Sequence, residues 1–274
     1  MRSYAHIISK LFYEPLLITP QRHAALCQLL ETRMASPAIV AQDPDADKPE
    51  PADDAEDLKQ YGKTCIIPVH GTLVQYPEDI AMSECGCAIE DLNAMIDVAE
   101  NDATISRVIY DFRTPGGSVT GIPETGRKIL HSRKETIAYT ESECCSGGLW
   151  LAAQCQKFYA TESSRVGSVG VYCMTLDMSN GMKKSGVQVN AIFAGKYKLL
   201  GASFRPLADD ERKILQDGVD KIYTQFKEAM ESHRMVNDDN FGNGLVFDGP
   251  EAADIGFTDG VVESLEEILD NMVE

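Results

Sequence analysis

Apolar positions along this chain follow two patterns, short continuous runs and helical repeats. The continuous runs predict strands, and apolar residues at every third or fourth position predict helices. The expected strands cover residues 65–70, 105–112, 136–140 and 158–160, and the expected helices cover 90–100, 122–133, 176–185 and 208–235. Because the strands are apolar throughout and alternate with helices, the pattern predicts a layered α/β fold.

Three parts of the chain differ in composition. Residues 1–35 carry apolar positions at helical spacing and predict a helical N-terminal segment. Residues 36–62 predict a disordered linker, because 43–57 are acidic, rich in proline and free of aromatic residues. Such a composition buries too little apolar surface to offset the entropy of ordering. The folded body is expected at 63–274.

The balance of charge restricts the partners of the protein. A net charge of −18 over 274 residues argues against binding to nucleic acid or to an anionic membrane surface. The chain contains no run of about twenty apolar residues that would span a membrane. Its first apolar stretch is too short for a secretory signal. We therefore expect a cytoplasmic protein.

Cysteine spacing gives no indication of a metal site. The chain has eight cysteines and no Cys-x-x-Cys pair, and the spacing of Cys85 and Cys87 with His70 differs from that of zinc sites. Reduced thiols in a cytosolic chain are expected to act as small apolar residues. The glycines at 166–171 lack the spacing of a phosphate loop. The sequence predicts no metal and no cofactor.

A serine at a predicted strand-to-helix turn is the first candidate for chemistry. Ser146-Gly147-Gly148 follows the strand at 136–140 and precedes a helix-forming apolar run. The free N–H groups and positive dipole end of a helix stabilise an alkoxide or an oxyanion there. Ser146 is thus a candidate nucleophile, although such a stretch alone is more often an N-cap serine. Cys145 is a second candidate, but no histidine partner for its thiol is evident.

A second glycine turn, Pro115-Gly116-Gly117, ends the strand at 105–112. Strands that are neighbours in sequence commonly pair, so the two turns are expected side by side at one end of the sheet. The N–H of Gly116 or Gly117 and the N–H of Gly147 would then form an oxyanion hole. By itself, a Pro-Gly-Gly sequence is usually only a turn.

The histidines do not supply an obvious base for Ser146. His70 alone ends an expected strand, while the other four lie outside the body or late in expected helices: His6, His23, His131 and His233. A helix carboxyl end favours histidine on electrostatic grounds alone. Ser146 also lacks the Gly-x-Ser-x-Gly motif of a nucleophile elbow.

Four motifs in one order resemble a known family. They are Pro115-Gly116-Gly117, Ser146-Gly147-Gly148, Val166–Val171 and Gly195–Lys198. Together they resemble peptidase family S49, the signal-peptide-peptidase A-like serine–lysine proteases, over about residues 64–263. Segments 10–20 and 69–74 are similar to the phage lambda-type capsid assembly protease, or head-maturation, branch. The resemblance implies a peptidase domain at 63–274 with a Clp protease/crotonase-like fold and a helical N-terminal appendage.

The resemblance also implies roles for individual residues. Ser146 would be the nucleophile, Lys198 the general base and Ser168 a hydrogen-bond partner of the lysine amine. The residues that follow Lys198 match the pattern of the family better than those that follow Lys196, and the choice between the two lysines stays open. A lysine that acts as a base must be neutral, so its pKa has to fall from about 10.4 toward 7, which burial favours. Without the resemblance, Lys198 would be interpreted as a surface lysine on a polar loop.

The leading hypothesis is a serine endopeptidase with a Ser-Lys dyad that cuts scaffold, capsid or portal protein, or its own chain, in prophage head assembly. It implies a homo-oligomeric ring in the cytoplasm of the bacterial host cell or on the procapsid. One alternative is a soluble bacterial S49 peptidase that degrades signal peptides or small proteins. Alternatives of another class are a crotonase-like acyl-CoA enzyme, which needs neither Ser146 nor Lys198, and an inactive assembly component.

Overall fold

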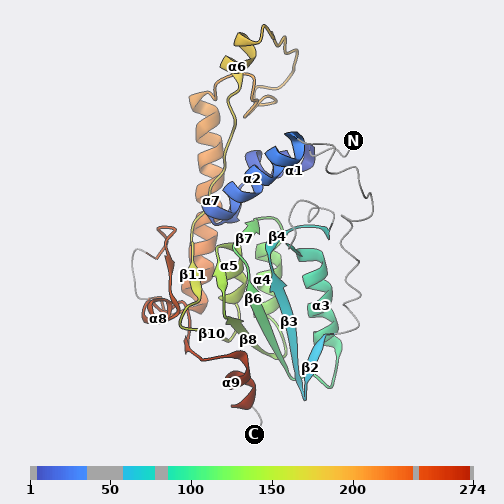
Figure 1. The fold of residues 1–274 in the computed structure, drawn as a ribbon, viewed down its shortest axis with the longest axis vertical. Coiled ribbons are helices and arrows are strands. Elements are labelled where there is room, and N and C mark those ends of the chain that lie inside the picture. The colour runs from blue at the N-terminus through green and yellow to red at the C-terminus, as the bar shows by residue number, and fades with distance from the viewer. Residues whose placement is uncertain (1–4, 36–57, 78–85, 237–240, 272–274) are drawn as a thin grey trace.

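The computed structural model of the chain describes residues 5–35, 58–77, 86–236 and 241–271 (Figure 1). Its centre is a six-stranded sheet with the order β13-β10-β8-β6-β3-β2. Neighbouring strands are parallel except for β2, which pairs antiparallel with β3 at one edge. The strands are β2 (Lys59–Tyr61), β3 (Thr64–His70), β6 (Arg107–Arg113), β8 (Glu135–Thr140), β10 (Lys157–Ala160) and β13 (Gly260–Val261).

Helices cover both faces of this sheet. One face holds the main apolar core, to which four helices contribute: α3 (Ile89–Asn101), α4 (Ile122–Leu130), α5 (Gly147–Ala152) and α7 (Asp209–His233). The core also includes Ala252 of α8 (Gly249–Asp254). The other face carries a smaller cluster that Ile268 of α9 (Leu265–Asp270) covers. The predicted layered α/β fold is confirmed, since strands apolar on both sides are buried between helices.

A second layer of short strands continues from the carboxyl ends of the central ones. After short turns, β3, β6, β8 and β10 lead into β4 (Thr72–Val74), β7 (Gly116–Ser118), β9 (Glu143–Cys145) and β11 (Arg165–Gly167). β4 and β7 share a sheet with β1 (Leu16–Ile18) and β5 (Gly86–Ala88), and β9 and β11 share one with β12 (Val246–Phe247). Both glycine turns therefore lie at one end of the central sheet, as predicted.

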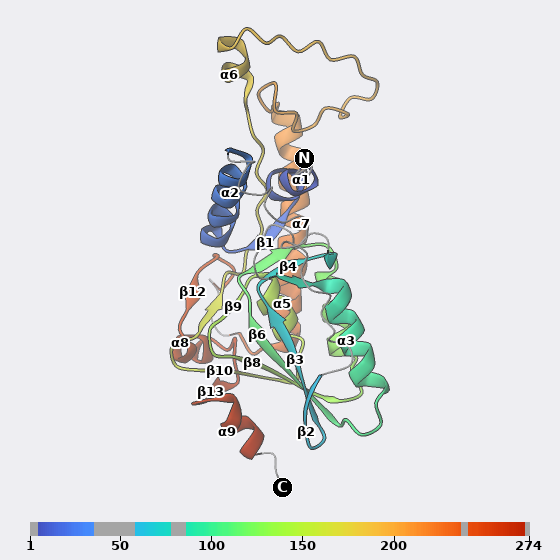
Figure 2. The same cartoon turned by 45° about the vertical axis from the view of Figure 1, so that its right-hand side comes forward.

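The N-terminal segment is more than a helical appendage. Its helices α1 (Ala5–Tyr13) and α2 (Pro20–Ala35) flank β1, and β1 pairs antiparallel with β7 of the body. Apolar side chains of α1, β1 and α2 form a cluster of their own, and Figure 2 shows β1 between these helices and the body. The predicted linker 36–62 ends too late, because Lys59–Tyr61 forms β2. Residues 36–57 lie outside the described part of the chain.

Residues 173–208, called the arm below, leave the body and carry one short helix, α6 (Ser179–Lys184). Figures 1 and 2 show α6 at one end of the molecule, beyond α1 and α2. The helix expected at 176–185 is thus shorter than predicted. The apolar stretch 187–193 forms no strand, and Ile192 is fully exposed. The arm buries little of its own apolar surface.

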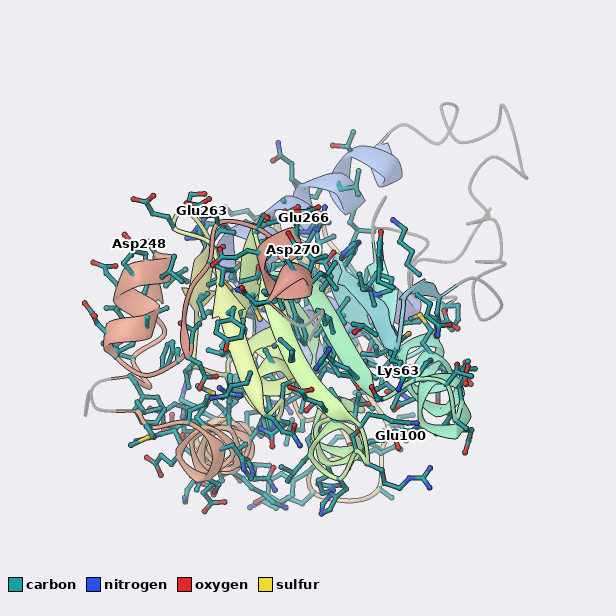
Figure 3. The ribbon with its side chains drawn as sticks, turned by 90° about the horizontal axis from the view of Figure 1, so that it is seen from below. Lys63, Glu100, Asp248, Glu263, Glu266 and Asp270 are labelled. Carbon is teal, nitrogen blue, oxygen red and sulfur yellow. The ribbon has the colours of Figure 1, made fainter. Side chains whose placement is uncertain are left out.

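Exposed carboxylates gather at the end of the molecule opposite the arm. Seen from that end, Glu263, Glu266 and Asp270 lie on and beside α9 (Figure 3). All three side chains are exposed to solvent. The net charge of −18 is therefore not concentrated in the acidic stretch at 43–57 alone.

Candidate active site

Ser146 lies in the turn between β9 and α5, in a strained backbone conformation. Its φ of 52° and ψ of −115° belong to a region that residues with a Cβ atom rarely occupy. The Ser146 N–H donates to the Gly167 carbonyl at 2.8 Å, and the first intrahelical bond of α5 runs from the Trp150 N–H to the Ser146 carbonyl at 3.0 Å. The neighbouring strand therefore fixes the turn on one side, and the helix fixes it on the other.

The Ser146 side chain is fully buried. Among the described residues, its Oγ has no hydrogen-bond partner. A buried hydroxyl without a partner costs free energy, so a purely structural serine would be expected to cap the helix. Ser146 occupies the N-cap position of α5, but its side chain makes no such cap bond, so helix capping does not account for the hydroxyl.

The two glycine turns lie side by side, as the sequence predicted. A Cβ atom built on Gly116 would stand 3.0 Å from the Gly147 nitrogen, and one built on Gly117 would stand 1.9 Å from the Leu73 carbonyl oxygen. Neither position can carry a side chain without movement of the backbone. The Gly116 N–H is already bound to Thr114 Oγ1 at 3.1 Å. That bond lies within the turn itself, whereas Gly117 pairs with the separate segment β1, so Gly117 is the better candidate of the two to act with Gly147.

Thr114 joins the two turns directly. Its N–H donates to the Glu143 carbonyl at 2.7 Å, and its carbonyl accepts the Cys145 N–H at 3.0 Å. The Thr114 side chain also leaves no space at Gly148, where a Cβ atom would stand 2.3 Å from the threonine methyl carbon. The second glycine after Ser146 is thus required by packing rather than by chemistry.

Ser168 is brought next to Ser146 by strand pairing. β11 pairs in parallel with β9, with Gly167 opposite Cys145, and Ser168 follows Gly167 directly. Ser168 is 6% exposed and has a φ of 60°, the second non-glycine residue with a positive φ among those described. Its N–H donates to the Leu245 carbonyl at 2.6 Å. Both strained residues of the described chain therefore lie at one site.

The cysteines before Ser146 are poor nucleophiles in this structure. Cys144 and Cys145 are buried, and Cys145 Sγ contacts the Arg165 carbonyl at 3.6 Å. Burial raises the pKa of the Cys145 thiol to about 12 and raises that of Cys144 well above its ordinary value. Since the thiolate is the reactive form of cysteine, these thiols stay protonated at neutral pH.

Lys198, the predicted base, lies in the arm and is not brought to Ser146 within one chain. Its side chain is exposed, and its N–H donates to the Gly195 carbonyl at 3.0 Å. The neighbouring Lys196 pairs with Asp210 at the start of α7 at 2.8 Å. Phe226 lies sixteen residues after Asp210 in α7, which is about 24 Å along the helix at 1.5 Å per residue. Phe226 stacks on Trp150 of α5, the helix that Ser146 begins. The contact of Lys196 with α7 is therefore far along this helix from the contact that α7 makes with α5.

Lys196 is unsuited to be the base in this arrangement. The hydrogen bond to Asp210 is the largest of several effects that raise the pKa of the Lys196 amine. A general base needs the opposite shift. Among the described residues no carboxylate pairs with Lys198, so the structure favours Lys198 over Lys196 while leaving the role of Lys198 a prediction.

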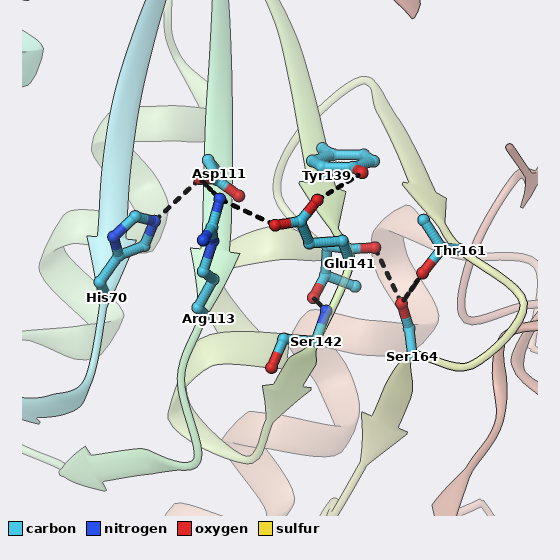
Figure 4. Close-up of polar contacts among 9 residues, drawn as sticks. His70, Asp111, Arg113, Tyr139, Glu141, Ser142, Thr161 and Ser164 are labelled. Atoms are coloured by element: carbon cyan, nitrogen blue, oxygen red, sulfur yellow. Dashed lines mark hydrogen bonds and ion pairs between the residues drawn. The ribbon is translucent and has the colours of Figure 1, made fainter. Parts of the chain in front are cut away.

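His70 forms an ion-pair network away from Ser146. Its Nε2 lies 2.8 Å from Asp111 Oδ2, which also accepts a bond from Arg113 at 3.1 Å (Figure 4). Arg113 pairs in turn with Glu141 at 3.0 Å. Because side chains alternate across a strand, Asp111 shares the α9 face of the sheet with Ile109, opposite to α5. His70 is therefore not a partner of Ser146.

Burial raises the pKa of the Asp111 carboxyl, but the hydrogen bond from His70 and the charges of His70 and Arg113 outweigh it. The net effect holds that pKa below its ordinary value of 3.8. Asp111 therefore stays ionised at neutral pH, as the buried carboxylate of a network whose other members are partly exposed. The network is explained by the stability of the sheet end and needs no catalytic role.

Sequence reasoning missed the strand that covers the site. Leu17 pairs with Gly117 across β1 and β7, and Leu16 pairs on its other side with Tyr172. The residues of β1 are only an apolar triplet between two prolines, and nothing local identifies their distant partners. Thr114 was missed for the same reason.

The described ranges of the chain contain no group of three or more histidine, cysteine, aspartate or glutamate residues placed to hold a metal ion. Cys85, one of the cysteines considered above, lies outside those ranges. None of the helices in the described part of the chain is long and apolar enough to cross a membrane.

Comparison with known proteins identifies relatives of the whole chain. Capsid assembly protease C of Escherichia phage lambda is 26% identical over 98% of this chain and 65% of its own length. Head-tail preconnector protein GP5 of Enterobacteria phage P21 is 26% identical over 97% of this chain and 57% of its own length. The chain therefore spans less than two thirds of either relative. The solved 1510-N membrane-bound stomatin-specific protease aligns over 77% of this chain and 85% of its own, at 15% identity and a TM-score of 0.45.

A family model defines the relationship more firmly. The model of peptidase family S49 matches residues 128–273, a range that includes Ser146, Ser168 and Lys198. Gly116 and Gly117 precede the matched range, and the structure places them beside it. The family expected from the ordered motifs is confirmed: the chain belongs to peptidase family S49.

Proposed function

We propose that the protein is a serine endopeptidase in which Ser146 is the nucleophile. One observation carries the proposal: the Ser146 hydroxyl is buried, without a partner among the described residues, in a strained glycine turn that lies beside a second one. Strain of this kind costs about 1–3 kcal/mol and is typical of functional sites. A merely structural serine would not need it.

The proposed reaction is acyl transfer to Ser146. A neutral lysine takes the proton from Ser146 Oγ, which attacks the carbonyl carbon of a peptide bond. The N–H groups of Gly117 and Gly147 bind the oxyanion, and one such donor contributes about 2.7–4 kcal/mol to transition-state stabilisation. The lysine then gives its proton to the leaving amine, and water releases the acyl group from Ser146. Ser168 is proposed to hold the lysine amine in position.

We propose that Lys198 comes from the arm of a second copy of the chain. Within one chain Lys198 lies in the arm, near the start of α7, whereas Ser146 lies in the body. The arm exposes apolar side chains that a second copy would cover, including Ile192 at 100% and Phe193 at 53% exposure. Burial in such an interface would also disfavour the charged form of the amine, as a lysine base requires.

The biological role is proposed from the relatives. Two phage proteins, one named a capsid assembly protease and the other a head-tail preconnector, match nearly the full chain. We therefore propose that the substrates are capsid, scaffold or portal proteins of a phage or prophage, cut in the host cell or on the procapsid. A cellular S49 peptidase that degrades signal peptides or small proteins is the remaining alternative.

Mixing inactive variants tests the shared site. Ser146→Ala and Lys198→Ala should each lose cleavage of an unstructured protein by at least 100-fold, and Lys196→Ala is the matched control that should retain it. When the two inactive variants are mixed and allowed to exchange subunits, some sites combine an intact Ser146 with an intact Lys198. We expect cleavage to return toward one quarter of the wild-type rate. Full activity of both single variants would refute the dyad.

A further inference from the structure

The extended segment β1 lies between two other backbone edges. On one side it pairs antiparallel with β7, from Leu16 opposite Ser118 to Ile18 opposite Gly116. On the other side the Leu16 N–H donates to the Tyr172 carbonyl at 2.8 Å, and the Tyr172 N–H donates back at 3.3 Å. A three-residue strand with both edges bonded is held in the way that a bound peptide adds to a sheet.

The position of β1 relative to the two glycine turns is unusual. The point at which Gly116 would carry a Cβ atom lies 2.0 Å from the Leu17 carbonyl oxygen and 3.0 Å from the Gly147 nitrogen. A Cβ atom on Gly147 would in turn lie 3.4 Å from both Leu17 Cβ and the Leu17 oxygen. The Leu17 carbonyl therefore occupies the small space between the two glycine turns that flank Ser146.

The pattern of strand bonds gives the direction of that carbonyl. Hydrogen-bonded and non-bonded pairs alternate along antiparallel strands. The Thr19 N–H donates to the Pro115 carbonyl at 3.0 Å, so the next hydrogen-bonded pair is Leu17 with Gly117. The Leu17 carbonyl thus accepts the Gly117 N–H, one of the two donors assigned to the oxyanion.

The side chains of β1 alternate between two clusters. Leu17 is fully buried in the main core of the body, whereas Leu16 and Ile18 belong to the cluster formed with α1 and α2. A peptide that replaced β1 would keep one inward side chain, at the position of Leu17. The contacts made by the side chains at positions 16 and 18 depend on the N-terminal helices.

We propose that the cleft between β7 and Tyr172 is the binding site for an extended peptide and that residues 14–19 of the chain occupy it in place of substrate. This inference rests on the proposed function. The ligand is a strand with an aliphatic side chain at the position of Leu17, and its carbonyl at that position lies against Gly117. Substrate enters only when β1 leaves, so the N-terminal segment holds the enzyme closed.

Peptide binding without chemistry tests this inference. In full-length chains carrying Ser146→Ala, Leu17→Asp introduces a carboxylate into an apolar site and should displace β1. Leu17→Met conserves polarity and volume and is the matched control. The probe is a fluorescent peptide with the sequence of residues 14–21, followed by anisotropy. We expect the Asp variant to bind it at least tenfold more tightly than the Met variant, and a probe with aspartate in place of Leu17 to bind neither.

A second variant covers the case in which Leu17→Asp does not fold. Leu16→Pro removes the N–H that bonds Tyr172, and amide exchange in β6 reports whether the body is intact. Folded variants that bind the probe no more tightly than the Met control would overturn the proposal, even if the enzyme cleaves proteins. Tight probe binding by chains that, with Ser146 restored, cleave no unstructured protein would support the cleft and refute the peptidase function.

Discussion

At the scale of the residue, Ser146 combines two unfavourable states that neighbouring residues maintain. Its positive φ forces the Cβ atom into a crowded position, and its hydroxyl is buried without a partner among the described residues. The bonds from the Ser146 N–H to Gly167 and from the Trp150 N–H to Ser146 hold the turn in place. Strain that is held by its surroundings keeps the hydroxyl oriented before substrate arrives.

Replacing Ser146 separates its cost to folding from its role in cleavage. Glycine normally lowers stability relative to alanine by about 0.5–1 kcal/mol, but it accepts the φ of 52° without strain. We expect Ser146→Gly to be more stable than Ser146→Ala by about 1 kcal/mol, while both lose cleavage. Urea unfolding of the two variants measures the difference. An alanine variant more stable than the glycine variant would show that the turn is not strained.

The residues of the site differ in how far the sequence reveals them. The two glycine turns, one of which carries Ser146, were predicted to meet because the strands before them are neighbours in the chain. Ser168 was predicted only from the resemblance to the family. The preference for Gly117 over Gly116 depends on the Thr114 side chain binding the Gly116 N–H, which no spacing indicates. The position of Lys198 depends on the path of the whole arm, which the sequence does not indicate, and its role as the base stays a prediction.

At the scale of the element, the N-terminal segment docks as one unit. α1, α2 and β1 share an apolar cluster, to which Tyr172 of the body adds. His23 of α2 is buried in this region; its Nε2 lies 2.9 Å from the Leu11 carbonyl and 3.6 Å from Cys27 Sγ, and its ring packs against Phe12 and Tyr172. Loss of this packing would release β1 from the site.

Acidification should loosen the N-terminal segment. Burial lowers the pKa of His23 below its ordinary value of 6.5, and the smaller effect of the Leu11 carbonyl raises it. The unfolded segment therefore binds a proton more readily, and its docking is stable above pH 6.5 and weakens as the pH falls below that value. We expect amide exchange at Leu16 and Tyr172, corrected for intrinsic rates, to rise between pH 7.5 and 5.5.

A variant that cannot titrate provides the control for this pH effect. In His23→Leu the corrected exchange rates at the same two amides should not change between the two pH values. The same rise in both proteins would show that another group controls the docking of the segment.

Elements with strong local patterns were predicted well. The central strands and the long helix α7 lie within a few residues of their predicted ranges, because their continuous or periodic apolar positions are buried as the pattern implies. The arm was predicted less well, because its apolar residues at 187–193 stay exposed within one chain. β1 and β2 were missed because each is three residues long and depends on a distant partner strand.

At the scale of the whole molecule, the arm and the body each hold one of the two groups that the proposed Ser-Lys dyad requires. Among the described residues, nothing in the body bonds the buried hydroxyl of Ser146, and Lys198 in the arm is exposed. Figure 1 shows the arm extending away from the strands and α5 that surround the serine. A homo-oligomer in which the arm of one copy reaches the body of the next would bring Lys198 to Ser146 and bury the lysine.

Charges on the arm should disrupt that assembly. Covering side chains such as Ile192 and Phe193 contributes about 1.5–3 kcal/mol each, so Ile192→Asp with Phe193→Asp should shift the chain toward monomers and reduce cleavage at least tenfold. Light scattering with size-exclusion chromatography measures the mass. Asn190→Asp, which adds a charge at an exposed polar position of the same segment, should leave both unchanged. An unaltered mass in the double variant would refute an interface at this place.

In the proposed mechanism, Ser146 is an activated nucleophile and Lys198 is its base. The most direct test is mass spectrometry of the intact protein and its peptides after treatment with a serine-reactive fluorophosphonate. The expected result is one adduct, located on Ser146, that is lost in Ser146→Ala, falls at least tenfold in Lys198→Ala and persists in Lys196→Ala. An adduct on another residue, or undiminished labelling of Ser146 in the Lys198→Ala variant, would contradict it.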